Sequence, residues 1–275
     1  MKDYRIIDAH SHIFPGKVAD KAVESINRFY DMAMYGQGTA KALLASGRQI
    51  GVDKYLICST ATRADQVESI NDFIFESCAR HSEFIGFATI QPGQPDLEEQ
   101  MGKIIARGFS GIKLHPDFQQ FYLDSDEAMK IYEIAEGRLP ILFHTGDFRY
   151  DYSKPGRLAK VAERFPRLTC IGAHFGGWSE WEEALTAYDN TPNVYMDTCS
   201  SLYTLPRKQV WKFINRYGPE RFFFGTDFPM WNHADELRRF LALGLPEDIN
   251  RAILADNFER VVLGYKNCYA DKKLP

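Results

Sequence analysis

The stretch Arg5-Ile6-Ile7-Asp8-Ala9-His10-Ser11-His12 determines how the rest of the chain is interpreted. Ile6 and Ile7 are typical of a short buried β-strand. Because side chains on a strand alternate between its faces, we expect His10 and His12 to point the same way, with Asp8 below them. Two such imidazoles make half of a site for a divalent metal ion, and the aspartate can fix a ring tautomer. Alone, the pattern also fits two surface histidines.

Short apolar runs of strand length recur along the whole chain, and segments of helical length separate them. Strands that alternate with helices predict a parallel sheet. Eight such units in a chain of 275 residues favour a single-domain (β/α)8 TIM barrel over residues 1–275, with a doubly wound open sheet as the alternative. Neither G-x-G-x-x-G nor a P-loop motif is present, which weakens nucleotide-binding interpretations. The eight predicted strands are 6–8, 55–58, 84–90, 111–115, 141–144, 170–174, 194–197 and 222–226.

Helix start and stop signals support this alternation. An Asp or Ser followed three residues later by Glu predicts a helix N-terminus, and glycine predicts a C-terminus. The stops are Gly137, Gly218 and Gly244. The predicted starts are Asp65 with Glu68, Asp96 with Glu99, Asp124 with Glu127, and Ser179 with Glu182.

Two regions are longer than a minimal βα unit. Residues 14–51 predict two helices, 18–30 and 39–49, on either side of Tyr35-Gly36-Gln37-Gly38. This pair could form a flap over the barrel mouth or an ordinary cover on the barrel's side. After the eighth strand, helices at 234–242 and 247–254 precede a closing helix at 257–263 that we expect to pack on the barrel.

Composition narrows the classes of partner. The formal charge is −4 and no basic run occurs, which argues against nucleic acid. No apolar stretch approaches the roughly 20 residues that a membrane helix needs. The chain enters its first strand almost at once, so we expect no signal peptide. Five scattered cysteines without C-x-x-C spacing predict reduced thiols and a cytoplasmic location.

Polar side chains stand at the carboxyl ends of six predicted strands. In a barrel these ends converge on one mouth, where active sites lie. Histidine and aspartate together suit Zn²⁺, and also Mn²⁺ or Fe²⁺. A bound ion would lower the pKa of a water molecule, which a neighbouring histidine or carboxylate could deprotonate. The residues are His10 and His12, Lys113 and His115, His144, His174, Asp197, and Asp227.

Taken in order, these motifs resemble the amidohydrolase superfamily, specifically its amidohydrolase-2 branch of TIM-barrel metal-dependent hydrolases and decarboxylases. The resemblance spans nearly the whole chain. The matching pieces are Asp8-Ala9-His10-Ser11-His12, Gly111-Ile112-Lys113-Leu114-His115-Pro116, His144-Thr145-Gly146, Gly172-Ala173-His174-Phe175-Gly176-Gly177 and Gly225-Thr226-Asp227-Phe228-Pro229.

The resemblance implies a role for each matching residue. His10, His12, His144 and Asp227 would be metal ligands, and Asp227 would also take a proton from bound water. His174 would act as a base beside one metal ion, most simply Zn²⁺. In two-metal relatives the histidine at the position of His174 is a ligand and a carboxylated lysine bridges the ions. Lys113 could fill that place, although we favour it as a handle for a substrate carboxylate.

Aromatic residues in the loops after the strands suggest the kind of substrate. Together with Arg149, they would suit a small, flat or cyclic carboxylate. Arg149 could equally pair with a neighbouring aspartate, and the aromatics could simply pack the loops. His115 and Trp231 are further candidates for substrate contact, whereas His115 could also be a structural histidine before Pro116.

Three classes of function follow. We expect metal-dependent hydrolysis of an amide, lactone or ester on a small substrate, with nonoxidative decarboxylation on the same scaffold as the alternative. A non-catalytic binding barrel is the third class. We also expect a homodimer as one oligomeric state, with contacts from Phe14 and the region 30–35.

Overall fold

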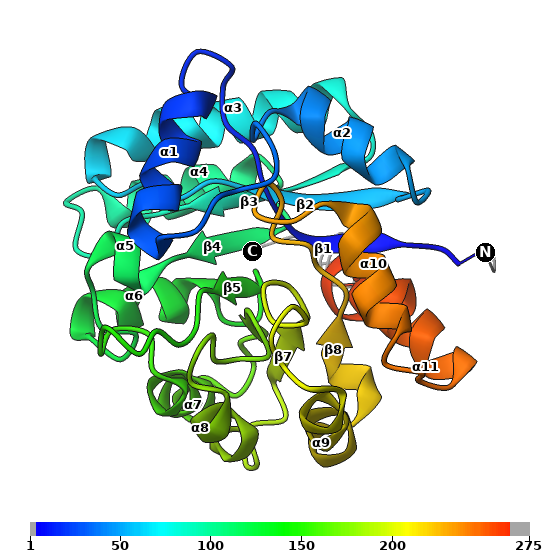
Figure 1. Ribbon diagram of the computed structural model, residues 1–275. Coiled ribbons are helices and arrows are strands. Elements are labelled where there is room, and N and C mark those ends of the chain that lie inside the picture. Colours follow the sequence, from blue (N-terminus) through cyan, green and yellow to red (C-terminus); the bar gives the residue numbers. More distant parts are fainter. Residues whose placement is uncertain (1–3, 265–275) are drawn as a thin grey trace.

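Eight parallel strands form the centre of the described chain. The structure, a computed structural model, describes residues 4–264. Each strand pairs in parallel with the next in chain order, as a (β/α)8 barrel requires (Figure 1). The strands are β1 (Ile7–His12), β2 (Lys54–Cys58), β3 (Phe84–Thr89), β4 (Gly111–Leu114), β5 (Ile141–Phe143), β6 (Cys170–Gly172), β7 (Val194–Asp197) and β8 (Phe222–Phe223). The predicted TIM barrel and its eight strands are confirmed.

Hydrogen bonds between the first and last strand regions close the barrel. The Ala9 N–H donates to the Phe224 carbonyl and the Asp227 N–H donates to the His10 carbonyl, both at 2.8 Å. Helices surround the strands (Figure 1). They are α1 (Ala19–Tyr30), α2 (Ala40–Arg48), α3 (Val67–Arg80), α4 (Leu97–Ala106), α5 (Pro116–Gln119), α6 (Asp126–Ala135), α7 (Pro155–Arg164), α8 (Trp181–Ala187), α9 (Arg207–Tyr217), α10 (His233–Leu241) and α11 (Glu247–Arg251).

The apolar core has two parts. The larger lies between the strands and the surrounding helices, with side chains such as Ile57, Leu114 and Phe143. In the smaller part, strand residues such as Ile7 pack against the C-terminal segment. That segment contains two π-helical stretches, η3 (Ala252–Asp256) and η4 (Glu259–Leu263). Its Phe258 and Val262 are buried, so the predicted closing helix does pack on the barrel.

The predicted helix stops hold better than the predicted starts. Gly137, Gly218 and Gly244 all have positive φ, which suits a residue without Cβ. Of the starts, Asp96 is the N-cap residue of α4, although its side chain bonds the Gln94 and Gln100 amides instead of a backbone N–H.

The other three starts were wrong because their side chains find different partners. The Asp65 carboxylate pairs with Arg63, and Asp124 pairs with Arg157. Ser179 accepts from the Phe148 N–H across 31 residues. The N-terminus of α6 is capped by Ser125, whose hydroxyl accepts from the Ala128 N–H.

The helix pair after β1 divides between the two places that the sequence allowed. Helix α2 lies on the barrel's side against α10, where the His233 ring contacts the Ser46 hydroxyl at 2.8 Å. Helix α1 instead extends over the ends of the strands (Figure 1). Ala19 is its only fully buried residue. Of the two predicted helices, α2 therefore covers the side of the barrel and α1 covers its mouth.

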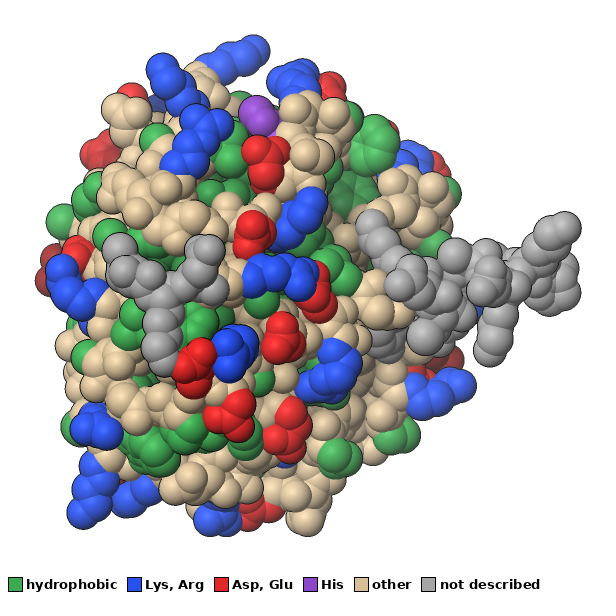
Figure 2. Space-filling model, turned by 90° about the vertical axis from the view of Figure 1, so that its right-hand side faces the viewer, with side chains coloured by type: hydrophobic (Ala, Val, Ile, Leu, Met, Phe, Trp, Pro, Cys, Tyr) green, Lys and Arg blue, Asp and Glu red, His purple; other side chains and the backbone are tan. Residues whose placement is uncertain are grey.

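Charges are mixed over the outer surface. Figure 2 shows one side of the molecule on which Lys and Arg side chains are interspersed with Asp and Glu side chains. Within residues 4–264 no helix is both long and apolar enough to cross a membrane. The four cysteines in this range form no disulfide with one another, and Cys268 lies outside it.

Candidate active site

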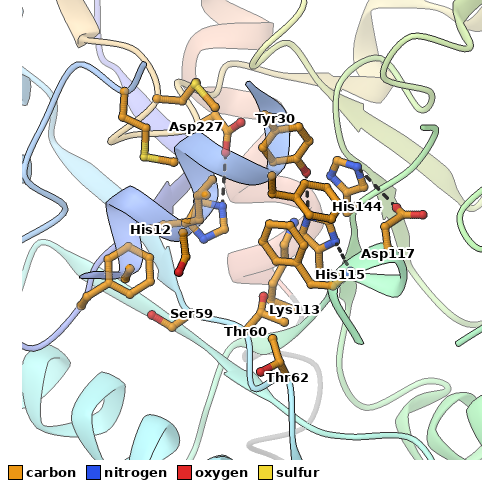
Figure 3. Close-up of a pocket in the computed structure, with 18 of the residues that line it drawn as sticks. His12, Tyr30, Ser59, Thr60, Thr62, Lys113, His115, Asp117, His144 and Asp227 are labelled. Atoms are coloured by element: carbon orange, nitrogen blue, oxygen red, sulfur yellow. Dashed lines mark hydrogen bonds and ion pairs between the residues drawn. The ribbon is translucent and has the colours of Figure 1, made fainter. Parts of the chain in front are cut away.

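Three predicted metal ligands meet at the mouth of the barrel. His10 and His12 come from β1, and Asp227 follows β8. Figure 3 shows His12 and Asp227 facing each other. The Nε2 atoms of the two histidines are 3.1 Å apart. The Asp227 Oδ1 lies 3.2 Å from the His12 Nε2 and 3.7 Å from the His10 Nε2. Three potential donor atoms thus face one common point.

Buried partners hold the His10 ring. Its Nδ1 lies 2.8 Å from the Asp197 Oδ2, so the ring donates there and its Nε2 lone pair faces the mouth. The Lys113 side-chain nitrogen lies 3.2 Å from that Nε2. Burial, with the charge of Lys113, lowers the pKa of His10 to about 4. The imidazole is therefore neutral at neutral pH, which is the form that binds metal ions.

His12 and Asp227 form an ion pair. Burial lowers the pKa of His12, but the Cys58 sulfur and the Asp227 carboxylate outweigh it and raise that pKa to about 9. Burial likewise opposes ionisation of Asp227, yet the hydrogen bond from His12 and the neighbouring His10 and His174 rings hold the pKa of Asp227 well below the usual range. A proton thus lies between the two groups where a cation could replace it.

A short relay fixes the Asp227 carboxylate from its other side. The Ser200 hydroxyl donates to the Asp227 Oδ2 at 2.5 Å, and the Trp231 Nε1–H donates to the Ser200 oxygen at 3.0 Å. The Trp231 ring stacks on Tyr203 with centroids 4.7 Å apart. Trp231, predicted to contact substrate, therefore also positions Asp227 through Ser200.

His144 is separated from the group of His10, His12 and Asp227 by the His174 ring. Its Nδ1 is 3.0 Å from the His174 Nε2, while the His174 Nδ1 donates to the Cys199 carbonyl at 3.2 Å. The structure thus brings His144 to His174, not to His10 or His12 directly. The buried Nε2 of His144 has no hydrogen-bond partner and lies 3.7 Å from the Asp117 Oδ2. Burial lowers the pKa of the His144 ring well below its usual value.

His115 continues this row of rings. It stacks on His144 at 3.9 Å and on Phe118 at 3.7 Å, with the planes within 6° of parallel. Its Nδ1 accepts from the Phe118 N–H, so the ring proton sits on Nε2 and is donated to the Tyr30 oxygen at 2.9 Å. His115 is therefore hydrogen-bonded within the structure and also faces the cavity.

The His10, His12 and Asp227 group fits a divalent cation. The two histidines present neighbouring nitrogens and the aspartate an ionised oxygen, a donor set typical of zinc and manganese sites. Atoms 3.1 to 3.7 Å apart are spaced as ligands around one ion with bonds of about 2.1 Å. Asp197 supplies the carboxylate behind the histidine that such sites require.

The predicted role of Asp8 was wrong. Asp8 accepts hydrogen bonds from Ser11, Thr226 and the His10 N–H, and it lies 3.0 Å from the His233 Nε2. It touches neither the His10 nor the His12 ring, because the register of β1 shifts between Asp8 and Ser11. The irregularity breaks the strict alternation on which the prediction rested. Asp197 takes the expected place.

A cavity of about 780 Å³ opens above this group. Lys113, His115 and Trp231 line it, as do His144 and His174. The side chain of Lys113 is only 1% exposed. Figure 3 shows Tyr30 projecting from α1 toward His115 and His144 at one side of the cavity. Phe14 and Tyr30, expected at a dimer contact, line the cavity as well.

Arg149 is not among the residues that line the cavity. Its guanidinium binds both oxygens of the buried Asp147, at 2.9 and 2.6 Å, and donates to the Phe29 carbonyl at the end of α1. It also lies over the Phe29 ring, 4.5 Å from the centroid. These contacts satisfy the guanidinium, which leaves the predicted substrate role without structural support.

Sequence reasoning missed several residues of the site. Asp117, Ser200 and Cys199 all lie within hydrogen-bond or ion-pair distance of a predicted site residue. A signal existed for each, because each comes just after a predicted strand end. Tyr30 carried no such signal, since it belongs to a helix whose position over the mouth the sequence left open.

The fold and this group of side chains define a TIM-barrel protein with a candidate metal centre at its mouth. The sequence profile of the amidohydrolase family matches residues 7–262. The chain therefore belongs to the amidohydrolase family. A search of curated protein sequences finds no match.

Solved structures share the fold over nearly the whole chain. A 5-carboxyvanillate decarboxylase from Sphingomonas paucimobilis is 16% identical, with a TM-score of 0.75 over 95% of this chain and 99% of the other. A dihydroxybenzoic acid decarboxylase from a Polaromonas species, with bound manganese and the inhibitor 2-nitroresorcinol, is 14% identical, with a TM-score of 0.74 over 97% and 100%. A candidate 2-pyrone-4,6-dicarboxylic acid hydrolase from Pseudomonas putida is 16% identical, with a TM-score of 0.66 over 96% and 99%.

Proposed function

We propose that this protein is a metal-dependent nonoxidative decarboxylase that acts on an aromatic or otherwise unsaturated carboxylic acid. The observation that carries the proposal is the buried Lys113 beside the His10 and Asp227 group, at the floor of a cavity with aromatic walls. The decarboxylase structures that share the fold support this order of preference over hydrolysis.

The cavity floor has the parts that such a reaction needs. The Lys113 nitrogen can bind a substrate oxygen, and a flat ring can lie among Tyr30, Phe118 and Trp178. The carbon–carbon bond breaks, CO₂ leaves, and the electron pair stays on the ring carbon, which then takes a proton. Asp227 and His174 are the side chains that would carry this proton. A divalent ion on His10, His12 and Asp227, with His144 as the predicted further ligand, would polarise the substrate.

The ion itself is part of the proposal. The family resemblance suggested Zn²⁺ with Mn²⁺ or Fe²⁺ as alternatives, and the manganese in the Polaromonas enzyme makes Mn²⁺ an equal candidate. Metal analysis of the purified protein by plasma mass spectrometry distinguishes them. About one ion per chain, lost in His12→Ala, is expected, whereas two would favour a bridging carboxylated Lys113.

Isotope labelling tests the reaction. The protein is loaded with Mn²⁺ or Zn²⁺ and incubated in H₂¹⁸O with hydroxybenzoic and unsaturated acids carrying a ¹³C carboxyl group. We expect ¹³CO₂ release without ¹⁸O in the organic product, and loss of turnover in Asp227→Asn and His174→Asn. Asp189→Asn is the matched control, because Asp189 pairs with Arg216 on the surface.

Hydrolysis is the second candidate. It is favoured by the His174 ring, whose Nδ1 donates to the Cys199 carbonyl. The Nε2 is therefore the nitrogen that can accept a proton, and it would exchange its 3.0 Å contact with the His144 Nδ1 for water. The candidate Pseudomonas hydrolase with this fold adds support. Incorporation of ¹⁸O from an amide or lactone substrate, with no CO₂, would contradict decarboxylation and establish this function.

A further inference from the structure

The cavity extends well beyond the polar floor. One side is lined by Val18, Ala22 and Ile26, which stand one helical turn apart at the start and along α1. The other side is lined by Ile70 and Phe73 of α3. We call the space between these five residues the arm. In Figure 1, α1 and α3 lie beside each other on the same side of the barrel.

Helix α1 does not bury its apolar stripe in the core. An amphipathic helix normally packs such a stripe against its neighbours. Here Ala22 and Ile26 are only half-buried and Val18 is 45% exposed, although all three face the cavity. The stripe therefore faces space that a bound molecule can fill.

The α3 side of the arm is anchored. Ile70 and Phe73 are half-buried and pack against the main core, so their positions are fixed from behind. Gln66 and Ser69 of the neighbouring turn also line the cavity and supply polar atoms beside the apolar pair. The arm thus has one wall set by the core and one wall formed by α1.

The size of the cavity and the position of its charged side chains indicate what kind of ligand would fill it. A volume of about 780 Å³ belongs to pockets that hold drug-sized ligands, well above what one small aromatic acid fills. The charged side chains that line the cavity, His12, Lys113, Asp117 and Asp227, all come from segments after or within the strands. The five arm residues carry none. Because the proposed function places a substrate carboxylate beside Lys113, a ligand that fills both parts is anionic at one end and apolar at the other.

We propose that the substrate carries an apolar extension, an alkyl or aryl chain, that lies in the arm between α1 and α3. This inference rests on the proposed function for the carboxylate end, since continuity of the arm with the floor makes the substrate its occupant. The residues Val18, Ala22 and Ile26 would then select substrates by chain length, because each buried methylene adds favourable transfer free energy.

Binding measurements test this without turnover. Calorimetry on the Mn²⁺-incubated protein uses benzoate and its 4-ethyl, 4-butyl and 4-hexyl derivatives, and a parallel series of 4-alkylbenzyl alcohols. We expect affinity to rise about three- to fourfold per methylene. Ala22→Trp fills the arm and should flatten this dependence while benzoate still binds. Lys21→Trp places the same ring on the exposed side of α1 and should leave the dependence intact.

The outcomes separate the arm from the reaction. A chain-length dependence in the alcohols equal to that in the acids, with no preference for carboxylate, would support the arm and contradict the proposed function. Carboxylate binding that is independent of chain length, or no binding in either series, would overturn the arm. A dimer in light scattering that Val18→Asp separates would assign the α1 stripe to a second copy and also overturn the proposal.

Discussion

At the scale of single residues, the site depends on which carboxylate stands behind each histidine. Asp197 is fully buried and accepts from the His10 ring, and it also accepts from the backbone N–H groups of His174 and Cys199. One side chain therefore fixes both the ring of His10 and the backbone of His174. Burial disfavours its ionised form, yet the neighbouring His10 ring, with its hydrogen bond, and the His174 ring hold the pKa of Asp197 below its usual range.

Replacing Asp197 with asparagine should weaken metal binding about 10- to 100-fold, because the His10 ring loses the charge that fixes its tautomer. Competition with a chromophoric chelator measures the affinity for Zn²⁺ and Mn²⁺. Asp189→Asn again serves as the control. An unchanged affinity in a folded Asp197→Asn protein would show that His10 does not depend on this carboxylate.

Glu236 should make stability depend on pH. It is 1% exposed on α10, one of its oxygens has no hydrogen-bond partner, and burial raises its pKa to about 7 despite Arg239. A raised folded pKa stabilises the protein fully below the unfolded value, and this contribution is lost as pH rises through about 7. The loss between pH 4.5 and pH 8 amounts to about 3 kcal/mol at most.

The variant Glu236→Gln removes this titration. In urea unfolding at pH 5, 6.5 and 8, its stability relative to the parent protein should therefore improve toward pH 8. The exposed Glu24→Gln is the control. Parallel pH profiles for Glu236→Gln and the parent protein would argue that Glu236 titrates alike in the folded and unfolded chains.

The site also shows how far residue-level sequence reasoning reaches. The grouping of His10, His12 and Asp227 was predictable, because polar residues at the ends of parallel strands converge. The partner of His10 was not, because a register shift in β1 turned Asp8 away. A contact such as Trp231 to Ser200 joins loops 31 residues apart, and no spacing rule announces it.

At the scale of elements, the strands were predicted more reliably than the helix N-caps and the position of α1 over the mouth. Apolar runs predict these strands well, because strands of a parallel sheet are buried on both faces. Side-chain caps compete with ion pairs from distant parts of the chain, as Asp124 shows with Arg157. Helix α1 is amphipathic like any other surface helix, so its sequence does not tell whether it covers the core or the mouth.

Arg149 should act as a tether for α1. It joins the buried Asp147 to the carbonyl of Phe29. Arg149→Lys keeps the charge but loses the paired hydrogen bonds. Amide exchange in residues 19–30 should accelerate about fivefold, as expected for one lost hydrogen bond of about 1 kcal/mol. Exchange in the strands should not change.

Arg157→Lys is the matched variant, because Arg157 binds two carboxylates near α7 and has no contact with α1. If both variants leave exchange in residues 19–30 at the parent rate, other contacts hold α1, such as the Phe29 ring on Phe118 and the Tyr30 hydrogen bond with His115.

At the scale of the whole molecule, metal binding should stabilise the fold. An ion that binds only the native state adds about 2.7 kcal/mol at a free concentration 100 times the Kd. For a protein of this size the midpoint of thermal unfolding should rise by about 5 to 10 °C. Scanning calorimetry with and without Mn²⁺, and after chelation, measures the shift. His12→Ala should show none, and an equal shift in that variant would place the ion elsewhere.

The hydrogen bonds between β1 and the region after β8 give the candidate centre a further property. His10 and Asp227 are joined across the seam where the ring of strands closes, between an earlier and a later part of the chain. A growing chain that does not yet include β8 contains both histidines but lacks the Asp227 carboxylate opposite them. An ion bound there would therefore stabilise the closed barrel. It would do so by holding together two residues far apart in the sequence, a contact that forms slowly because a long loop must close.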